Sequence, residues 1–476
     1  MSHLEQIARR LETSPAQREH LITQVVAYAE RFLDQIGETP AYTVPTPDRT
    51  IPDLPIAEEG IGIEEVLALF HEHIDTPGLN PASGRYLGYV PGGSVFHAAL
   101  GDFLAAITNR YAGVMLGNPG AVQLEHRLLR WMADEIGYPQ TAAGNLSSGG
   151  SLANLTAIVT ARDAHHISGE VIPRSVIYTT EHVHHCLDKA LHIAGLRNCI
   201  RRTVPVDTGY RMDATALDAA ITADRQAGLN PWLVIASAGT TNSGAVDPLA
   251  AIGDIAATHG LWYHVDGAYG GLFVLCPEGR AVLQGLEQSD SIVIDPHKTL
   301  FLPYGTGAVL VKDRQRLYSA FSAHADYMEP LVDDEDDLSP ADLSPELTKH
   351  FRGLRLWFPL MLVGAGPFRA ALSEKIHLAR DFYERMKKLD GFEVGPYPDL
   401  SIVTYRYVPP RGDADAFNQQ LVQAVQREGN IFVSATRLNG KLVLRAAILC
   451  FRTHQAEIDV ALETLQRHAQ RLLDQA

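Results

Sequence analysis

The spacing of apolar and polar positions changes twice along the chain. Residues 1 to about 37 alternate apolar and charged positions at helical spacing, as in "LITQVVAYAERFLDQI", which predicts an N-terminal helix. The next stretch, "GETPAYTVPTPDRTIPDLP", carries five prolines, too many for a helix or a central strand. We therefore expect residues 1–95 to form a helical and extended arm that packs on a neighbour, within the chain or across a dimer.

Between residues 96 and 369, short apolar runs alternate with helical stretches such as "DPLAAIGDIAATHG". The β-rich runs cover residues 175–180, 232–241, 261–271, 291–296 and 307–313. Apolar strands that alternate with helices predict an α/β domain with a mostly parallel sheet covered on both faces. Ligands bind such sheets at the carboxyl ends of the strands, so the polar residues that end each run are candidate site residues.

A third pattern begins near residue 370. The runs "AALSEKIHLARDFYERMKKL", "LSIVTYRYV" and "KLVLRAAILC", followed by a terminal helix, predict a small α+β domain over residues 370–476. Between the two domains, residues 321–350 contain the acidic stretch "LVDDEDDLSPADLSP". Such a stretch is typical of a solvated loop, and its length also makes it a candidate active-site lid.

Composition narrows the class of protein. At 476 residues and 46% hydrophobic, the chain can bury a large core, and a net charge of −16 argues against a nucleic-acid binder. No apolar run resembles a signal peptide or spans a bilayer, so we expect no membrane contact. The four cysteines are scattered, which favours a reducing cytoplasm over a disulfide framework or a zinc ribbon. They are Cys186, Cys199, Cys276 and Cys450.

Two strand ends carry ionisable side chains. "SIVIDPHKTLF" delivers His297 and Lys298 after an apolar run, where an unpaired charged amine is costly. Taken alone, Lys298 could be a surface lysine with a buried stem. "HVDGAYGG" places Asp266 at the end of another run, as a helix N-cap, a metal ligand or the partner of a protonated heterocyclic nitrogen. Ala268, two residues later, leaves space for a flat ring.

Three other motifs offer polar groups. "NLSSGGSLANLTAIVTAR" is a Gly-rich turn before a helix, either an ordinary N-cap or an anion site. It is not a Walker loop, because no GKS or GKT follows. The hydroxyls of Thr240 and Thr241 in "SAGTTNSGAVDP" cap a turn or bind a ligand oxygen. The HxHH of "TTEHVHHCLDKAL" lacks a nearby cysteine or third-ligand spacing, so we expect an imidazole stacked on a planar group and no metal.

Together these parts describe one ligand. The Gly-rich turn takes a phosphate, Asp266 favours a protonated ring nitrogen, a histidine covers one face of the ring, and Ala268 lies under the other. Lys298 supplies an amine. That ligand is pyridoxal 5′-phosphate (PLP), bound to the lysine as a Schiff base. Its protonated pyridine would act as an electron sink for a carbanion at the α-carbon of a substrate.

The order SGGS, HxHH, GTT, HVDxAYGG and PHK resembles that of the group II PLP-dependent decarboxylases, which include aromatic L-amino acid, glutamate and histidine decarboxylases. The resemblance runs from "RYLGYVP" (85–91) to "LRAAILCFRTH" (444–454). It implies the type I aminotransferase-like fold and a homodimer with sites near the interface. It also implies catalytic roles for Lys298, His184 and Asp266, cofactor contacts from Gly150, Ser151, His184, Thr241, Asp266, Ala268, His297 and Lys298, and substrate contacts from Tyr89 and Arg445.

Three positions depart from these relatives. Asp295 stands where several relatives have Asn. The catalytic loop tyrosine of the animal aromatic decarboxylases corresponds by counting to Pro340, with Tyr327 upstream as a candidate substitute. Gly113 and Met115 stand roughly where aromatic-specific relatives carry bulky rings.

The expected activity is decarboxylation of an L-amino acid, with an aromatic one favoured, to an amine and CO₂ by a cytoplasmic homodimer. One alternative is oxidation of the same carbanion by O₂ to an aldehyde and ammonia, and another is a C–C lyase reaction. A third is a degenerate scaffold that only binds partners. The intact Lys298, Asp266 and His184 argue against the scaffold.

Overall fold

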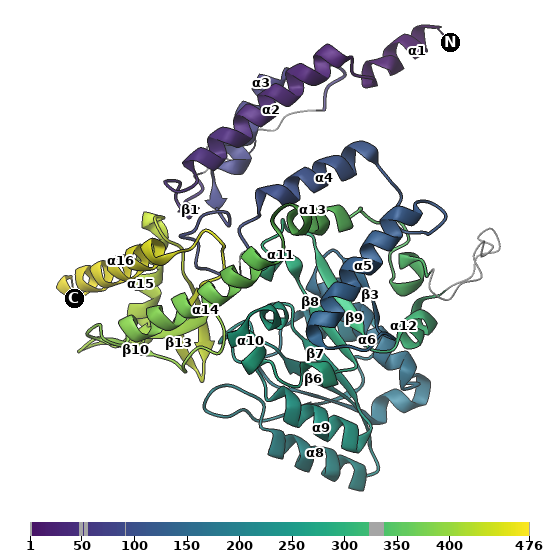
Figure 1. Ribbon diagram of the computed structural model, residues 1–476. Coiled ribbons are helices and arrows are strands. Elements are labelled where there is room, and N and C mark those ends of the chain that lie inside the picture. Colours follow the sequence, from purple (N-terminus) through teal and green to yellow (C-terminus); the bar gives the residue numbers. More distant parts are fainter. Residues whose placement is uncertain (1, 47–50, 52–55, 91, 323–337, 476) are drawn as a thin grey trace.

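The core of the protein is a seven-stranded sheet with the strand order β3-β9-β8-β7-β6-β4-β5 (Figure 1). The computed structural model describes residues 2–46, 51, 56–90, 92–322 and 338–475. The strands are β3 (Ala143–Ser147), β4 (Ser175–Thr179), β5 (Ile200–Thr203), β6 (Asn230–Ser237), β7 (Trp262–Asp266), β8 (Ser291–Ile294) and β9 (Gly307–Val311). β8, β7, β6, β4 and β5 pair in parallel, whereas β9 runs antiparallel to both β3 and β8. The predicted mostly parallel α/β sheet is confirmed.

Helices cover both faces of this sheet, which is why β4 and β8 are buried along their whole length. Side chains alternate along β6. Leu233 and Ile235 join the hydrophobic cluster on one face of the sheet, whereas Val234 and Ala236 join the cluster on the other face. The helices of this region are α4 (Phe96–Thr108), α5 (Pro119–Ile136), α6 (Gly150–Ala164), α7 (Cys186–Ile193), α8 (Ala214–Gln226), α9 (Leu249–His259), α10 (Pro277–Val282), α11 (Pro296–Thr299), α12 (Arg314–Phe321) and α13 (Gly353–Val363).

A second, antiparallel sheet has the order β10-β11-β13-β12. Its elements are α14 (Gly366–Met386), β10 (Phe392–Val394), β11 (Ile402–Tyr407), α15 (Ala414–Glu428), β12 (Ser434–Leu438), β13 (Lys441–Ala447) and α16 (Gln455–Asp474). Phe382, Tyr405 and Leu465 pack in its own core, but Leu372 and Ile376 of α14 pack in the core of the large sheet. The helix α14 runs through the predicted boundary at 369/370. The domain limits 1–95, 96–369 and 370–476 stay a prediction.

The N-terminal arm extends away from the rest of the chain (purple in Figure 1). It contains α1 (Ser2–Ala8), α2 (Pro15–Gln35), β1 (Tyr42–Thr43), α3 (Ile63–Phe70) and β2 (Gly78–Leu79). A capping box between Ser14 and Gln17 starts α2, with a proline in the first turn. No residue of α2 is buried, although Ile22 and Val26 are apolar. Among the described residues of the arm, Ala41 and Tyr86 pack against Phe432 of the C-terminal region, and no hydrophobic cluster is made of arm residues alone.

The chain that follows residue 337 is fixed to β3. The Asn145 side-chain amide donates a hydrogen bond to the carbonyl of Pro340 (3.0 Å), and Lys349 Nζ lies 2.6 Å from Glu125 Oε1, both side chains being buried. Tyr327 and the acidic run DDEDD (333–337) fall within residues 323–337, outside the described part of the chain. The predicted lid over residues 321–350 therefore stays a prediction.

Long apolar helices are scarce in the described part of the chain. No single helix there has both the length and the apolar composition to cross a bilayer. α13 and α14 meet those criteria only as a pair, and they bend by 94° where they join.

Candidate active site

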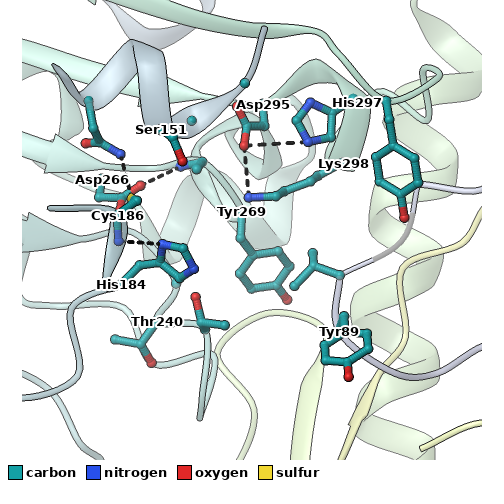
Figure 2. A pocket seen from close by; sticks show the side chains of 18 of the residues that line it. Tyr89, Ser151, His184, Cys186, Thr240, Asp266, Tyr269, Asp295, His297 and Lys298 are labelled. Atoms are coloured by element: carbon teal, nitrogen blue, oxygen red, sulfur yellow. Dashed lines mark hydrogen bonds and ion pairs between the residues drawn. The ribbon is translucent and has the colours of Figure 1, made fainter. Parts of the chain in front are cut away.

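A cavity of about 800 Å³ lies at the carboxyl ends of β6, β7 and β8 (Figure 2). The predicted site residues that line it are Gly150, Ser151, His184, Thr241, Asp266, Ala268, His297, Lys298 and Tyr89. Parallel strands end at one edge of a sheet, which is how segments far apart in the sequence meet there. Arg445 is not among the residues that line the cavity. The catalytic and binding roles assigned to all of these residues stay predictions.

The amine of Lys298 is held by a buried carboxylate. Lys298 lies on the short helix α11, and its Nζ is 2.9 Å from Oδ2 of Asp295, whose side chain is 2% exposed. Burial disfavours the charged amine, but the negative charges of Asp295 and Asp266 outweigh this effect and raise the pKa of Lys298. The Lys298 side chain is therefore protonated, and it must lose a proton before its amine can attack a carbonyl.

Glycines shape the anion cradle at the start of α6. The helix has no side-chain cap, so its first N–H groups are available to an anion. A Cβ on Gly150 would lie 2.9 Å from Asp295 Oδ2, and a Cβ on Gly307 would lie 2.6 Å from the backbone of Gly149. A side chain at either position would fill the cradle. This explains why a glycine is needed at position 150 of the SGGS motif and at position 307.

His297 lies beside this cradle. Its Nδ1 is 2.6 Å from the carbonyl oxygen of Thr306, which can only accept, so Nδ1 carries the hydrogen. Nε2 is left facing Asp295 at 3.8 Å. Burial lowers the pKa of His297, which keeps the ring neutral near pH 7. The predicted phosphate contact fits this position, because a Cβ on Gly149 would lie 3.4 Å from the imidazole.

Asp266 ends β7 inside the cavity. Burial raises the pKa of Asp266, while the Lys298 charge and the Ala268 N–H, which donates to Oδ1 over 3.1 Å, oppose the rise. Burial has the larger effect, and the two contacts reduce the rise without cancelling it. Ala268 next to it is small and only 9% exposed.

His184 presents a neutral ring to the cavity. Its Nδ1 accepts the N–H of Cys186 (3.2 Å), which leaves the hydrogen on Nε2. Burial, with help from the charges of His185 and Lys298, lowers the pKa of His184 to about 4. A ring that is uncharged at neutral pH suits stacking on a planar group. In the described part of the chain, no group of three or more His, Cys, Asp or Glu side chains is arranged to hold a metal ion.

The predicted strand at residues 232–241 is shorter than expected. β6 ends at Ser237, and Gly239 takes a φ of +97°, which turns the chain before the two threonines. Thr240 and Thr241 thus lie in the following turn, yet both still line the cavity. Within the turn the hydroxyls of Thr240 and Ser243 are 2.8 Å apart.

Sequence reasoning missed several lining residues, above all the three tyrosines Tyr86, Tyr269 and Tyr304. Tyr304 follows Lys298 by six residues in "FLPYG", where the Pro and Gly signal a turn back to the site. Arg445 lies behind Tyr89: it is 3% exposed, and its Nη2 donates to the Tyr89 carbonyl over 3.2 Å. Its predicted contact with a substrate carboxylate stays a prediction. Gly113 and Met115 are likewise not among the cavity-lining residues.

The cavity fits PLP. The cradle has the N–H groups for a phosphate, the carboxyl of Asp266 is the partner for a protonated pyridine nitrogen, and Lys298 is the amine for the aldehyde. Ala268 and His184 both line the cavity, where the small Ala268 leaves room for the ring. When bound, PLP supplies the electron sink that makes loss of CO₂ from an amino acid possible. The residues of the chain bind and orient it.

Comparisons with known proteins agree with this fit. The family model described as "Pyridoxal-dependent decarboxylase conserved domain" matches residues 49–408. An aromatic-L-amino-acid decarboxylase of Bacillus atrophaeus is 32% identical over 408 residues, which cover 85% of each chain. A phenylacetaldehyde synthase of Arabidopsis thaliana is 31% identical over 405 residues, 82% of this chain and 83% of that protein.

The fold agrees as well. The crystal structure of Oryza sativa TDC with PLP and tryptamine has a TM-score of 0.91 and 25% identity to this chain, and covers 97% of this chain and 99% of that one. The type I aminotransferase-like architecture predicted from the motifs is confirmed. Family model, relatives and cavity lead to the same conclusion: the chain belongs to the pyridoxal-dependent decarboxylases, enzymes that use PLP to remove a carboxylate from an amino acid.

Proposed function

We propose that this enzyme decarboxylates an aromatic L-amino acid and releases the corresponding amine and CO₂. The observation that carries the proposal is the wall of aromatic side chains, Tyr86, Tyr89 and Tyr304, that lines the same cavity as Lys298. Aromatic walls favour flat apolar side chains through offset or edge-to-face contacts. The name of the Bacillus relative and the tryptamine in the rice structure support the same substrate class.

The residues of the chain divide the work of the reaction. Asp266 holds the proton on the ring nitrogen, and His184 stacks as a neutral ring. Loss of CO₂ requires a later proton transfer to the α-carbon. Tyr327, outside the described residues, stays the predicted donor, and the Nε2–H of His184 is the alternative within the cavity.

The test is a product balance with a panel of L-amino acids: tyrosine, tryptophan, phenylalanine, glutamate and histidine. CO₂, amine, ammonia and hydrogen peroxide are measured separately. We expect equal amounts of amine and CO₂ from the aromatic substrates, without peroxide. Ammonia and peroxide in equal amounts, with consumption of O₂, would instead establish the aldehyde-forming reaction. A preference for glutamate would overturn the aromatic assignment.

We also propose that two copies form a homodimer. The α2 helix buries no residue, and α4 exposes apolar side chains beside α13 on the same side of the molecule (Figure 1). The exposed side chains of α4 are Phe96, Leu100, Phe103, Leu104 and Ile107. Exposed apolar faces of this extent are typical of interfaces.

Light scattering should give twice the chain mass of 52.0 kDa, and Phe103→Glu should shift the mass towards one chain. A single-chain mass for the unaltered protein would refute the dimer.

The proposed location is the cytoplasm. All four cysteines are free and buried, which suits a reducing compartment. Cell fractionation tests the proposal, and recovery of the protein outside the cytoplasmic fraction would refute it.

A further inference from the structure

The carboxylate of Asp295 lies against both the reactive amine and the anion cradle. Its Oδ2 is 2.9 Å from Nζ of Lys298, a contact that Figure 2 shows. A Cβ on Gly150, the first residue of α6, would lie 2.9 Å from the same oxygen, and a Cβ on Gly307 would lie 2.7 Å from Oδ1. A single buried carboxylate therefore pairs with the amine and backs the turn that receives a phosphate.

This carboxylate has few partners for a buried anion. The side chain is 2% exposed, and its Oδ1 has no hydrogen-bond partner among the described residues. Nε2 of His297 is 3.8 Å from Oδ2, but the hydrogen of that ring is on Nδ1, so Nε2 offers a lone pair. Buried carboxylates are normally paired and hydrogen-bonded at both oxygens. In the described part of the chain, the Lys298 ammonium is thus the main group that stabilises the charge of Asp295.

A phosphate in the cradle would bring a second anion next to this carboxylate. A phosphate monoester carries a charge of about −1.5 to −2 at pH 7. Like charges in a buried site disfavour each other, so the phosphate makes Asp295 a stronger proton acceptor. The ammonium proton of Lys298 is within hydrogen-bond distance of Asp295. Its transfer would leave two neutral side chains beside the phosphate and relieve the repulsion.

The same transfer prepares Lys298 for attack. Burial lowers the pKa of Lys298, and the charge of Asp295 leads the effects that raise it. Once Asp295 is protonated, that effect is gone and the neutral amine is favoured. Asp266 of β7 and the side chains of His184 and Cys186, near the start of α7, also influence this site. None of these three described residues forms a hydrogen bond or an ion pair with Nζ, so Asp295 is the acceptor in reach.

We propose that Asp295 is a catalytic acid–base residue that couples phosphate binding to activation of Lys298, because a phosphate in the cradle moves the ammonium proton from Lys298 to Asp295. The neutral amine then adds to the aldehyde of PLP. A C=N bond forms, the two hydrogens of the amine leave with the aldehyde oxygen as water, and Asp295 returns its proton to the imine nitrogen. The proposal rests on PLP as the cofactor of the family. It is independent of the substrate class proposed above and is measured without turnover.

The test separates the phosphate from the aldehyde. The full-length protein is freed of cofactor with hydroxylamine and is then offered pyridoxal, which has the aldehyde but no phosphate. Absorbance follows Schiff-base formation with and without inorganic phosphate, at an ionic strength held constant with KCl. Borohydride reduction and peptide mapping confirm that Lys298 is the amine that reacts. We expect phosphate to speed the reaction about 10-fold at neutral pH and to move the rate–pH profile about one unit lower, because one unit of amine pKa changes the neutral fraction tenfold.

Asp295→Asn should abolish this coupling. The amide cannot take up the proton, and Lys298 loses its counter-charge, so without phosphate pyridoxal should react about 10-fold faster than with the unaltered protein. Added phosphate should then change the rate less than about twofold. Asp313→Asn is the matched control: it makes the same exchange at the N-cap of α12, outside the cavity lining, where Asn also caps a helix. It should behave like the unaltered protein.

The unaltered protein alone can refute the proposal, since a rate and a pH profile that do not respond to phosphate would overturn it. Equal acceleration by phosphate in the unaltered protein and in a folded Asp295→Asn variant would overturn it too, because phosphate would then act without Asp295. If Asp295→Asn does not fold, Asp295→Ala is measured in the same way with the same expected results. The product balance described above does not enter these measurements, so the two proposals fail separately.

Discussion

The cavity has two walls that are built differently. Asp266, Asp295 and Lys298, here called the floor, lie at or just after the ends of β7 and β8 and are held by an ion pair and hydrogen bonds inside the protein. Tyr89 and Tyr304, here called the rim, come from loops and are 57% and 62% exposed. A fixed floor suits chemistry that the whole family shares, whereas an exposed rim can change without disturbing the sheet. Floor and rim should therefore respond differently to substitution.

The largest effect should follow from removing the floor amine. Lys298→Ala should lower kcat by roughly 10³-fold or more, because no other amine takes its place, while the anion cradle still retains much of the cofactor. Bound PLP is measured by absorbance and kcat by CO₂ release. Lys312→Ala, on a lysine that does not line the cavity, is the control and should keep full activity. Borohydride reduction that labels a lysine other than Lys298 would contradict the assignment.

Removing only the charge of the floor should have the next largest effect. Asp266→Asn should lower kcat by about 10²- to 10³-fold, because the neutral amide no longer favours a protonated ring nitrogen. PLP affinity should fall less than kcat does. Both constants are measured on the same preparation. Near-normal decarboxylation by the Asn variant would remove Asp266 from the mechanism.

A rim substitution should act on substrate binding alone. Tyr304→Ala should raise KM for an aromatic substrate about 3- to 10-fold through the loss of ring contacts, and leave kcat nearly unchanged. Tyr397→Ala removes a comparably exposed tyrosine that does not line the cavity, and should change neither constant. A fall in kcat at constant KM would show that the rim takes part in the chemistry, and the contrast between the two walls would fail.

The last effect concerns stability below pH 6.5 and leaves activity at neutral pH unchanged. Burial lowers the pKa of His264 to about 4 from the usual 6.5 of a histidine, so the unfolded chain binds this proton at a higher pH than the folded one. The contribution of His264 to stability is complete above pH 6.5 and is lost as the pH falls towards 4, by about 3 kcal/mol over the whole window. Urea unfolding at several pH values should show a shallower pH dependence for His264→Phe than for the unaltered protein. Parallel curves would contradict the prediction.

Much of the floor was predictable from the sequence. Apolar runs that end in Asp266 and Lys298 indicate parallel strands, and strands of one sheet bring their carboxyl ends together whatever their order. The reversed direction of β9 and the short β3, whose sequence is AGNLS, left no such signal, because neither changes the hydrophobic pattern. Whether two strands pair parallel or antiparallel depends on contacts between distant segments of the chain, and the local spacing of apolar residues does not show it.

The rim and the buried hydrogen bonds of His264 were harder to foresee. Tyr304 reaches the cavity because its loop turns back, which no periodicity encodes. His264 carried a usable signal, since the spacing of Trp262, His264 and Asp266 places them on one face of β7. Its partner Asn154 lies 110 residues away, and only the packing of α6 on the sheet brings the two together.

The buried hydrogen bonds that join Trp262, Ser291, His264 and Asn154 have an evolutionary consequence. Replacing one of these side chains by one with different donors and acceptors leaves a buried neighbour without a hydrogen bond. Single substitutions at these positions should therefore be selected against, even where a different set of four residues would be stable. Trp262, Ser291, His264 and Asn154 should then change together in lineages of this family, as an epistatic block. A designer who transplants the HVD segment into another scaffold should transfer the other three positions with it.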